Sequence, residues 1–355
     1  MLEAVKFGLN KEFRDRFQQA LNEHDNTFIL QSLEGVNAAD ITSLLYEFNS
    51  VESKYVLDML SLGIRAEIIS ALDSDTRGGF LKTYAPEELI AIVDQLDSDD
   101  AADILNELPI KVREEILVGL DSVLRSRVID LLRYDENVAG GLMAKELITA
   151  RVNWTVVQCI EEIRKQVENV SRFYAVYVVD DQYKLLGRVH LQKLILTDSS
   201  TLVKDIYDPE LISVQTHLED TEVASIMRKY DLESVPVVNV YNQLVGRITV
   251  DDVLDVITEQ ADEERQLMSG ISEDVEEADS LWRLTRARLP WLLIGIMGGL
   301  ISVQFIGAFA VDLMRVTAIA FFIPLIQATG GNVGIQSSTI VVQSLANPTF
   351  VEERL

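Results

Sequence analysis

An uncharged run of 21 residues, 291–311, constrains the fold of this chain more than any other feature. At 1.5 Å per residue, a helix of that length spans roughly 30 Å, the thickness of the hydrocarbon core of a bilayer. The run therefore predicts a membrane helix. Arg283, Arg286 and Arg288 lie just before it, and positive charges favour the cytoplasmic side of a membrane. We expect an integral protein of the plasma (inner) membrane whose N-terminal part lies in the cytoplasm.

A second uncharged run, residues 316–346, follows a short polar break and should return the chain to the cytoplasm as a hairpin. It contains Pro324 and several glycines and amides, which are costly at membrane depth unless they face protein or water. From the residues alone two interpretations stay open: close contacts between helices, or the wall of an ion pathway. The residues concerned are Gly330, Gly331, Asn332 and Gln336.

The charge of the chain is strongly negative, with 57 acidic and 31 basic residues and a net charge of −26. This disfavours nucleic acid as a partner and favours cationic ligands. At 355 residues, more than one hydrophobic core is expected. Paired histidines, Cys-x-x-Cys and a phosphate-binding loop are absent from the sequence, so we do not expect an enzyme. Cys159, the single cysteine, is interpreted as a buried structural thiol.

Residues 84–132 repeat with a period near twelve, and each unit begins with a turn or cap residue followed by apolar residues at helical spacing. The repeat places leucines at regular intervals, at Leu96, Leu108, Leu120 and Leu132. A short amphipathic helix cannot bury its apolar face alone. The units should therefore pack as an α-solenoid, and the residues before them show the same pattern less regularly.

Residues 173–195 and 234–257 share one order: an apolar strand, a polar turn, a strand containing Gly-Arg and then a helix. Eight residues separate Val179 from Gly187, and eight separate Val238 from Gly246. An amphipathic helix precedes each copy. The two copies resemble tandem cystathionine-β-synthase-type (CBS) domains, which pair with pseudosymmetry.

Acidic residues are concentrated at particular places. Asp99 and Asp103 are four residues apart, as are Asp251 and Asp255, and residues 251–280 contain twelve carboxylates with one basic residue. A single such pair usually belongs to a solvated face, but this concentration favours a cation site. Two carboxylates about 4 Å apart repel by roughly 4 kcal/mol at an effective dielectric of about 20. Mg²⁺ prefers oxygen ligands and keeps several waters, so it can bridge loosely placed carboxylates.

Several segments resemble the MgtE family of magnesium transporters, in the same order and at compatible spacing. They include RYDENVAGGLM at residues 133–143, the DDAAD and GRITVDDVLDV segments, and the GGNVGIQ segment within residues 317–346, which looks like the second membrane helix of the family. The resemblance implies a homodimer with five membrane helices per chain. Two of them are expected in this sequence, which we therefore expect to be truncated at Leu355, before the helix that carries the pore carboxylate of the family.

The expected fold class is multidomain. It combines an acidic, all-α superhelical N-domain (residues 1–134), two α/β CBS domains (135–197 and 198–258), a connecting or plug helix (259–288) and an incomplete α-helical transmembrane domain (289–355).

The resemblance further implies a Mg²⁺-selective channel that cytoplasmic Mg²⁺ regulates, with membrane lipid around its helices. The residues at the regulatory positions, with Asp255 added from its spacing and Glu264 standing where the family has aspartate, are Asp99, Asp103, Asp231, Asp252, Asp255, Glu263 and Glu264. The residues that would line the pore are Gly330, Gly331, Asn332 and Gln336.

Nucleotide binding has less support. Gly246, Thr249 and Asp252 of the second copy fit the pattern with which CBS domains hold a ribose. In the first copy, which would bind ATP in the family, His190 and Lys193 replace the hydroxyl and the acid. ATP is therefore not the expected ligand.

Two alternatives stay open. One is a membrane-anchored sensor of Mg²⁺ or nucleotide that transports nothing, and the other is a transporter of Co²⁺ or Ni²⁺. The absence of paired histidine or cysteine ligands from the sequence favours a hard cation over the second alternative.

Overall fold

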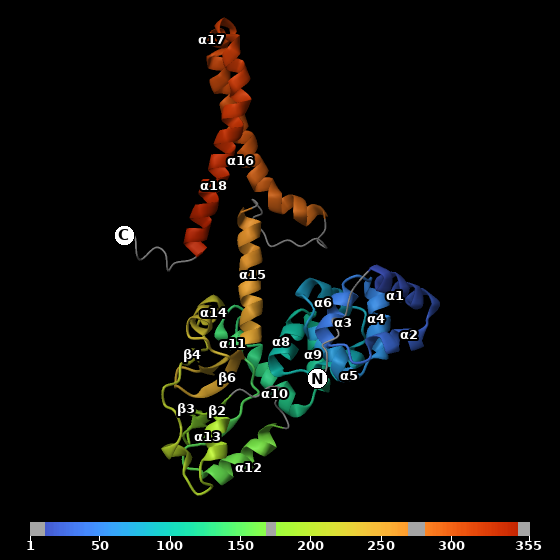
Figure 1. Cartoon of the computed structure of the whole chain (residues 1–355), viewed down its shortest axis with the longest axis vertical. Helices are drawn as coiled ribbons and strands as arrows, with labels where there is room; N and C mark the ends of the chain where they lie inside the picture. The colour runs from blue at the N-terminus through green and yellow to red at the C-terminus, as the bar shows by residue number, and fades with distance from the viewer. Residues whose placement is uncertain (1–10, 168–174, 269–280, 347–355) are drawn as a thin grey trace. The chain divides into compact units, whose positions relative to one another are not determined.

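The computed structural model describes residues 11–167, 175–268 and 281–346 (Figure 1). The chain divides into two compact units, Met1–Leu254 and Asp255–Leu355. The first unit contains a helical part followed by two small sheets, and the second contains long helices.

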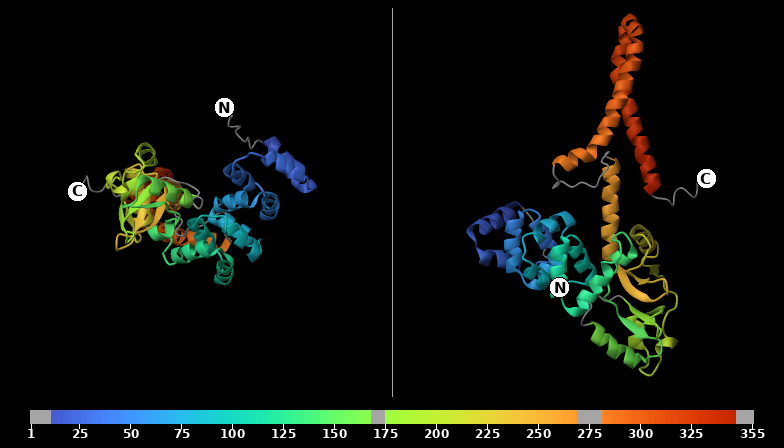
Figure 2. Two further views of the ribbon diagram at one scale, coloured as in Figure 1. Left: turned by 90° about the horizontal axis from the view of Figure 1, so that it is seen from below. Right: turned by 180° about the vertical axis from the view of Figure 1, so that it is seen from behind.

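From residue 11 onward, where the description of the chain begins, ten short helices form the first part of the N-terminal unit (Figure 2). They are α1 (Lys11–Glu23), α2 (Asn26–Leu33), α3 (Ala38–Leu45), α4 (Ser50–Met59), α5 (Leu62–Ser70), α6 (Ser74–Leu81), α7 (Pro86–Val93), α8 (Ser98–Asn106), α9 (Ile110–Gly119) and α10 (Ser122–Leu131). Helices two apart in the chain pack on each other: α3, α5, α7 and α9 form one row, and α2, α4 and α6 another. The predicted α-solenoid is thereby confirmed.

The regular leucines mark the ends of these helices. Leu120 and Leu132 are the C-terminal cap residues of α9 and α10, while Leu96 and Leu108 follow the ends of α7 and α8. Leu108 and Leu120 are buried. The repeats of α8 and α9 therefore bury a leucine where the helix ends, while Leu96 and Leu132 are half-buried at the equivalent positions.

Each copy of the later repeat forms a three-stranded mixed sheet. The first sheet has the order β1 (Thr149–Arg151), β2 (Val176–Val179), β3 (Leu185–Val189), and the second β4 (Val214–Gln215), β5 (Ser234–Val238), β6 (Leu244–Thr249). In both, the first pair of strands is parallel and the second antiparallel. The accompanying helices are α11 (Ala139–Leu142), α12 (Val156–Val167), α13 (Leu191–Leu196), the 3₁₀ turn η1 (Val203–Asp205), α14 (Asp220–Lys229) and α15 (Val250–Met268).

Equivalent residues of the two copies contact each other reciprocally. The Leu185 amide donates to the Asn242 carbonyl and the Leu244 amide to the Tyr183 carbonyl, each at 3.0 Å. Tyr183 and Asn242 both have left-handed backbones, with φ of 61° and 60°. This reciprocity supports the expected pseudosymmetric pair.

The glycine of each Gly-Arg pair stands where no side chain fits. A Cβ on Gly187 would meet the Asp208 carbonyl, and one on Gly246 would lie 2.5 Å from the Met143 sulfur. Close approach of a neighbouring segment therefore explains this part of the repeat. Cys159 is buried in the core of the first copy, as expected, and burial raises the pKa of its thiol to about 11.

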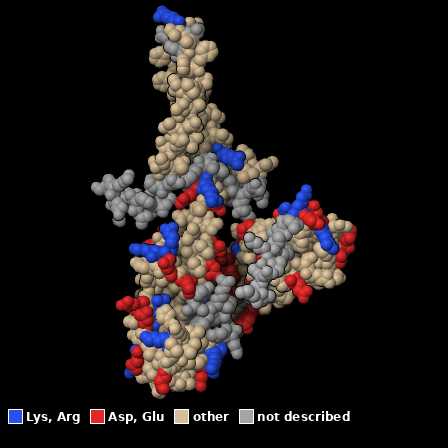
Figure 3. Space-filling view, in the orientation of Figure 1, with Lys and Arg blue, Asp and Glu red and all other residues tan. Residues whose placement is uncertain are grey.

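The C-terminal unit contains the rest of α15 and then α16 (Leu281–Ala308), α17 (Ala310–Arg315), the 3₁₀ segment η2 (Thr317–Phe322) and α18 (Ile323–Ala346). Within the described residues, the segment Leu284–Ala308 of α16 is the one helix long and apolar enough to cross a membrane. Figure 3 shows almost no charge over α18 and the later part of α16, whose first turns carry Arg286 and Arg288. The second expected membrane helix corresponds to α18, which is helical as predicted. That α18 crosses a membrane stays a prediction.

Candidate functional site

Two elements bring carboxylates together inside the N-terminal unit. Helix α8 begins with Asp99 and Asp100 in its first turn, and its apolar residues are buried against the neighbouring helices. Helix α15 follows directly after β6 and begins with Asp251 and Asp252 in its first turn. Burial raises the pKa of Asp99, of Asp100 and of Asp103 one turn further along α8, and the charge of Asp252 adds to the shift of each. We call Asp99, Asp100, Asp103 and Asp252 the acidic cluster.

Burial and mutual repulsion disfavour the charged forms of these side chains. Burial first, and then the charge of Asp252, raise the pKa of Asp99 well above its ordinary value. The same causes raise the pKa of Asp100 to about 6. Burial also raises the pKa of Asp252 to about 6, although hydrogen bonds from Thr249 act in the opposite direction. Near neutral pH these carboxylates are therefore harder to ionise than exposed ones, and a cation beside them would favour their charged forms.

Asp103 lies at the rim of the cluster. Its side chain is exposed to solvent, yet protein groups around it displace enough water to raise its pKa to about 7. Arg77 opposes this shift, and the charges of Asp100 and Glu136 add to it. The Nε of Arg77 also donates to Glu107 at 2.9 Å, so the charge of Arg77 is shared.

Asp252 also stabilises the start of α15. Its Oδ2 accepts hydrogen bonds from the backbone amide of Thr249 at 2.9 Å and from the Thr249 hydroxyl at 2.7 Å. Carboxylates in this position stabilise the first turn of a helix. The two residues that fit the nucleotide pattern are therefore hydrogen-bonded to each other.

A second set of contacts joins α8 to the segment before β1. Glu146, which is 2% exposed, accepts a hydrogen bond from the Ser98 hydroxyl at 2.7 Å and pairs with Arg127 of α10 at 2.8 Å. The next ion pair joins Lys145 to Asp130 at 2.6 Å. These contacts place Ser98, the residue before Asp99, against the first CBS copy. Neither Glu146 nor Arg77 was predicted, because neither lies in an acidic run.

The remaining predicted regulatory residues have other surroundings. Asp231 is exposed just after α14 and has a left-handed backbone with φ of 50°. Asp255 is exposed and Glu264 half-buried; both lie on α15 in the second unit. The side chain of Glu263 lies outside the described residues. The structure thus brings Asp99, Asp103 and Asp252 together and adds Asp100 to them.

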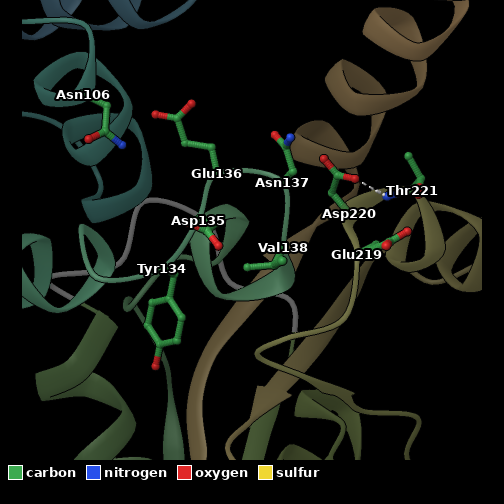
Figure 4. Close-up of a pocket in the computed structure, with 9 residues that line it drawn as sticks. All are labelled: Asn106, Tyr134, Asp135, Glu136, Asn137, Val138, Glu219, Asp220 and Thr221. Atoms are coloured by element: carbon green, nitrogen blue, oxygen red, sulfur yellow. Dashed lines mark hydrogen bonds between the residues drawn. The ribbon is translucent and has the colours of Figure 1, made fainter.

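A cavity of about 800 Å³ lies beside the C-terminal end of α8 (Figure 4). Its walls carry four carboxylates and two side-chain amides: Asn106, Asp135, Glu136, Asn137, Glu219 and Asp220. Burial raises the pKa of Asp220, and Glu136 also acts on Asp103. The cavity therefore extends the negative potential of the acidic cluster toward α14.

The carboxylates and amides of the acidic cluster and of this cavity could bind a hard cation, because every candidate ligand atom is an oxygen. Within the described ranges no three His, Cys, Asp or Glu side chains are placed to hold a metal ion directly. Among the described residues the carboxylates thus offer oxygen ligands without a closed coordination cage.

The predicted pore residues all lie on α18. Gly330, Gly331, Asn332 and Gln336 are exposed there, and the Thr329 hydroxyl donates to the Leu325 carbonyl at 2.8 Å. That these residues line an ion path stays a prediction.

Comparisons with known proteins point to one family. Residues 36–137 match the MgtE intracellular N domain, and residues 138–198 and 203–259 match CBS domains. The chain is 34% identical to the magnesium transporter MgtE of Thermus thermophilus over 341 residues, covering 93% of this chain and 74% of that protein. It is 27% identical to the MgtE of Bacillus subtilis, covering 86% and 68%.

A solved structure agrees with these matches. The cytosolic domain of the Mg²⁺ channel MgtE in complex with ATP superposes with a TM-score of 0.63 at 35% identity, covering 67% of this chain and 98% of that domain.

Proposed function

Because this chain belongs to the MgtE family of magnesium transporters, we propose that it carries Mg²⁺ across a membrane and that cytoplasmic Mg²⁺ regulates it. The transport proposal rests on the relatives, which are named as magnesium transporters. The regulatory proposal rests on one observation of this chain: carboxylates of α8 and α15 are buried near one another, and burial together with the charges of neighbouring carboxylates raises their pKa values.

At low Mg²⁺ the acidic cluster repels itself, and the contact between α8 and the start of α15 is weakened. At high Mg²⁺, hydrated ions offset the repulsion and stabilise the contact. An ion that binds only this closed form stabilises it by about 1.4 kcal/mol at a tenfold excess over its Kd. Four or five such ions would shift the populations from roughly 1:99 to 99:1.

Helix α15 would carry the change toward the membrane part. It begins in the acidic cluster and continues as one helix into the second compact unit. Asp231, Asp255, Glu263 and Glu264 are proposed as further Mg²⁺ contacts in one of the two states. The proposed assembly is a homodimer in the plasma (inner) membrane with the N-terminal unit in the cytoplasm.

For transport itself we propose that α18 lines the ion path. Asn332 offers an amide oxygen, while Gly330 and Gly331 beside it remove side-chain bulk so that a hydrated ion can approach. ATP is a weaker candidate ligand. It is bound in the related cytosolic domain, but His190 and Lys193 stand at the corresponding positions of the first copy here.

Mg²⁺ flux in proteoliposomes that contain a Mg²⁺-sensitive dye tests the transport proposal. In the protein with the five membrane helices that the resemblance implies, we expect Mg²⁺ to enter faster than into protein-free liposomes, and Asn332→Leu, which keeps the approximate volume and removes the amide, to abolish the difference. Ser338→Ala on the same helix is the matched control and should keep the flux. Entry no faster than into empty liposomes, or full flux in Asn332→Leu, would refute the corresponding part of the proposal.

A further inference from the structure

A second cavity, of about 510 Å³, is basic although the chain as a whole carries a charge of −26. Four cationic side chains contribute to its walls, and Asp130 is the single carboxylate among its lining residues: the cations are Arg125, Arg127, Arg133 and Lys145. Such a concentration of positive charge is the opposite of what surrounds the acidic cluster. It requires its own explanation.

The carboxylates near this cavity do not balance its cations. Asp130 lies 2.6 Å from Lys145 and 3.6 Å from Arg133 and is shared between them, while Glu146 pairs with Arg127. Arg125 forms no ion pair within the described residues, although its charge acts on Asp121 at the start of α10. One of its terminal nitrogens donates to the Leu120 carbonyl at 2.7 Å, but its buried Nε has no hydrogen-bond partner. A buried guanidinium donor without an acceptor is available to a further ligand.

The cavity joins two parts of the N-terminal unit. Ser122, Arg125 and Ser126 lie three and four residues apart on one face of α10, and Arg133 follows just after the helix ends at Leu131. Lys145 belongs to the segment that leads from α11 to β1 of the first CBS copy. A ligand in the cavity would therefore contact the helical part and the CBS part together.

We propose that this basic cavity binds a phosphate group, from a soluble polyphosphate or from a lipid headgroup. The planar guanidinium of arginine matches phosphate oxygens in pairs, lysine supplies a compact charge, and the serine hydroxyls donate hydrogen bonds. The volume lies in the range of small-molecule sites. Bound phosphate holds α10 to Lys145 and so strengthens the connection that Glu146 and Ser98 already make beside the acidic cluster.

Calorimetric titration of the full chain tests this site. Inorganic pyrophosphate is the soluble probe, glycerophosphoglycerol is the headgroup probe, and a chelator keeps Mg²⁺ from complexing either. We expect Arg125→Gln/Arg133→Gln to weaken binding about tenfold or more. Arg164→Gln/Arg228→Gln, which removes two exposed arginines outside the cavity, should bind as the wild type does. Arg133→Gln alone alters a side chain that is 72% exposed, and it serves if the double variant fails to fold.

The pattern of binding identifies the source of the phosphate. Pyrophosphate binding that the cavity variants weaken supports a soluble polyphosphate. Binding of glycerophosphoglycerol alone, weakened by the same variants, supports a lipid headgroup. The proposal is overturned if the wild type binds neither probe, or if the cavity variants and the control variant bind equally well. Transport is not measured, so failure of this site leaves the proposed function standing.

Discussion

Asp99, Asp100 and Asp252 bind protons more tightly in the folded chain than in an unfolded one, because burial and the charges of their neighbours raise their pKa values. Each group therefore makes its whole contribution to folding stability at pH values below 3.8, the ordinary pKa of an aspartate. This contribution is lost as the pH rises through the pKa in the folded chain, which is about 6 for Asp100 and Asp252. Near neutral pH, ionisation of the acidic cluster therefore lowers the stability of the fold unless a cation occupies the cluster.

Protons and Mg²⁺ should compete for the acidic cluster. We expect the Mg²⁺ concentration that half-saturates the chain to fall as the pH rises from about 5 to about 8, by roughly tenfold per pH unit for each proton displaced. Calorimetric Mg²⁺ titrations at several pH values, in buffers of different ionisation enthalpy, measure both the affinity and the protons released. An affinity that does not change over this range would mean that these carboxylates do not bind the ion.

Among the elements, the connection between α8, α10 and the segment before β1 depends on Glu146. This buried side chain accepts from Ser98 and pairs with Arg127. Glu146→Ala would remove the acceptor of the Ser98 hydroxyl and the ion-pair partner of Arg127. Removing one partner of a buried ion pair lowers folding stability by about 3 to 5 kcal/mol.

We expect Glu146→Ala to lower the free energy of unfolding by about 3 kcal/mol, the lower end of that range because Arg127 is 31% exposed. Denaturant unfolding followed by circular dichroism measures the change, and Glu161→Ala, at an exposed position of α12, is the control. Equal free energies of unfolding for the two variants would show that Glu146 does not stabilise the contact between α8, α10 and the segment before β1.

The repeats could be predicted from the sequence because each is a local pattern. Leucines recur at the ends of α7 to α10, buried at Leu108 and Leu120, and Gly187 and Gly246 recur where a neighbouring segment approaches each sheet. The composition of the site was only partly predictable. Asp99, Asp103 and Asp252 followed from the family resemblance. Asp100 joins them through tertiary packing, which no local pattern encodes.

Other contributors were missed for the same reason. Arg77 reaches the acidic cluster from α6, and Glu146 is an isolated carboxylate whose burial depends on Ser98 and Arg127. The basic cavity combines a visible stripe of α10 with Lys145, which lies beyond α11. Such contacts depend on how helices pack, and spacing along the chain does not reveal them.

At the scale of the whole molecule, the two units of the chain differ in the chemistry of their surfaces. The N-terminal unit carries most of the charge, while α16 exposes a row of large apolar side chains that water would not favour. Helix α15 is the covalent and helical link between the units. Regulation of transport by Mg²⁺ therefore requires that the acidic cluster control the start of α15.

Limited proteolysis of the full chain across a Mg²⁺ titration measures this control directly. We predict that millimolar Mg²⁺ protects the unit Met1–Leu254 in the wild type and that Asp99→Asn/Asp252→Asn needs about tenfold more Mg²⁺ for half-protection. Asp40→Asn/Glu161→Gln, which removes two exposed carboxylates elsewhere in the same unit, should behave as the wild type does. Equal cleavage of the wild type in Mg²⁺ and in chelator, or equal half-protection of all three proteins, would contradict the account.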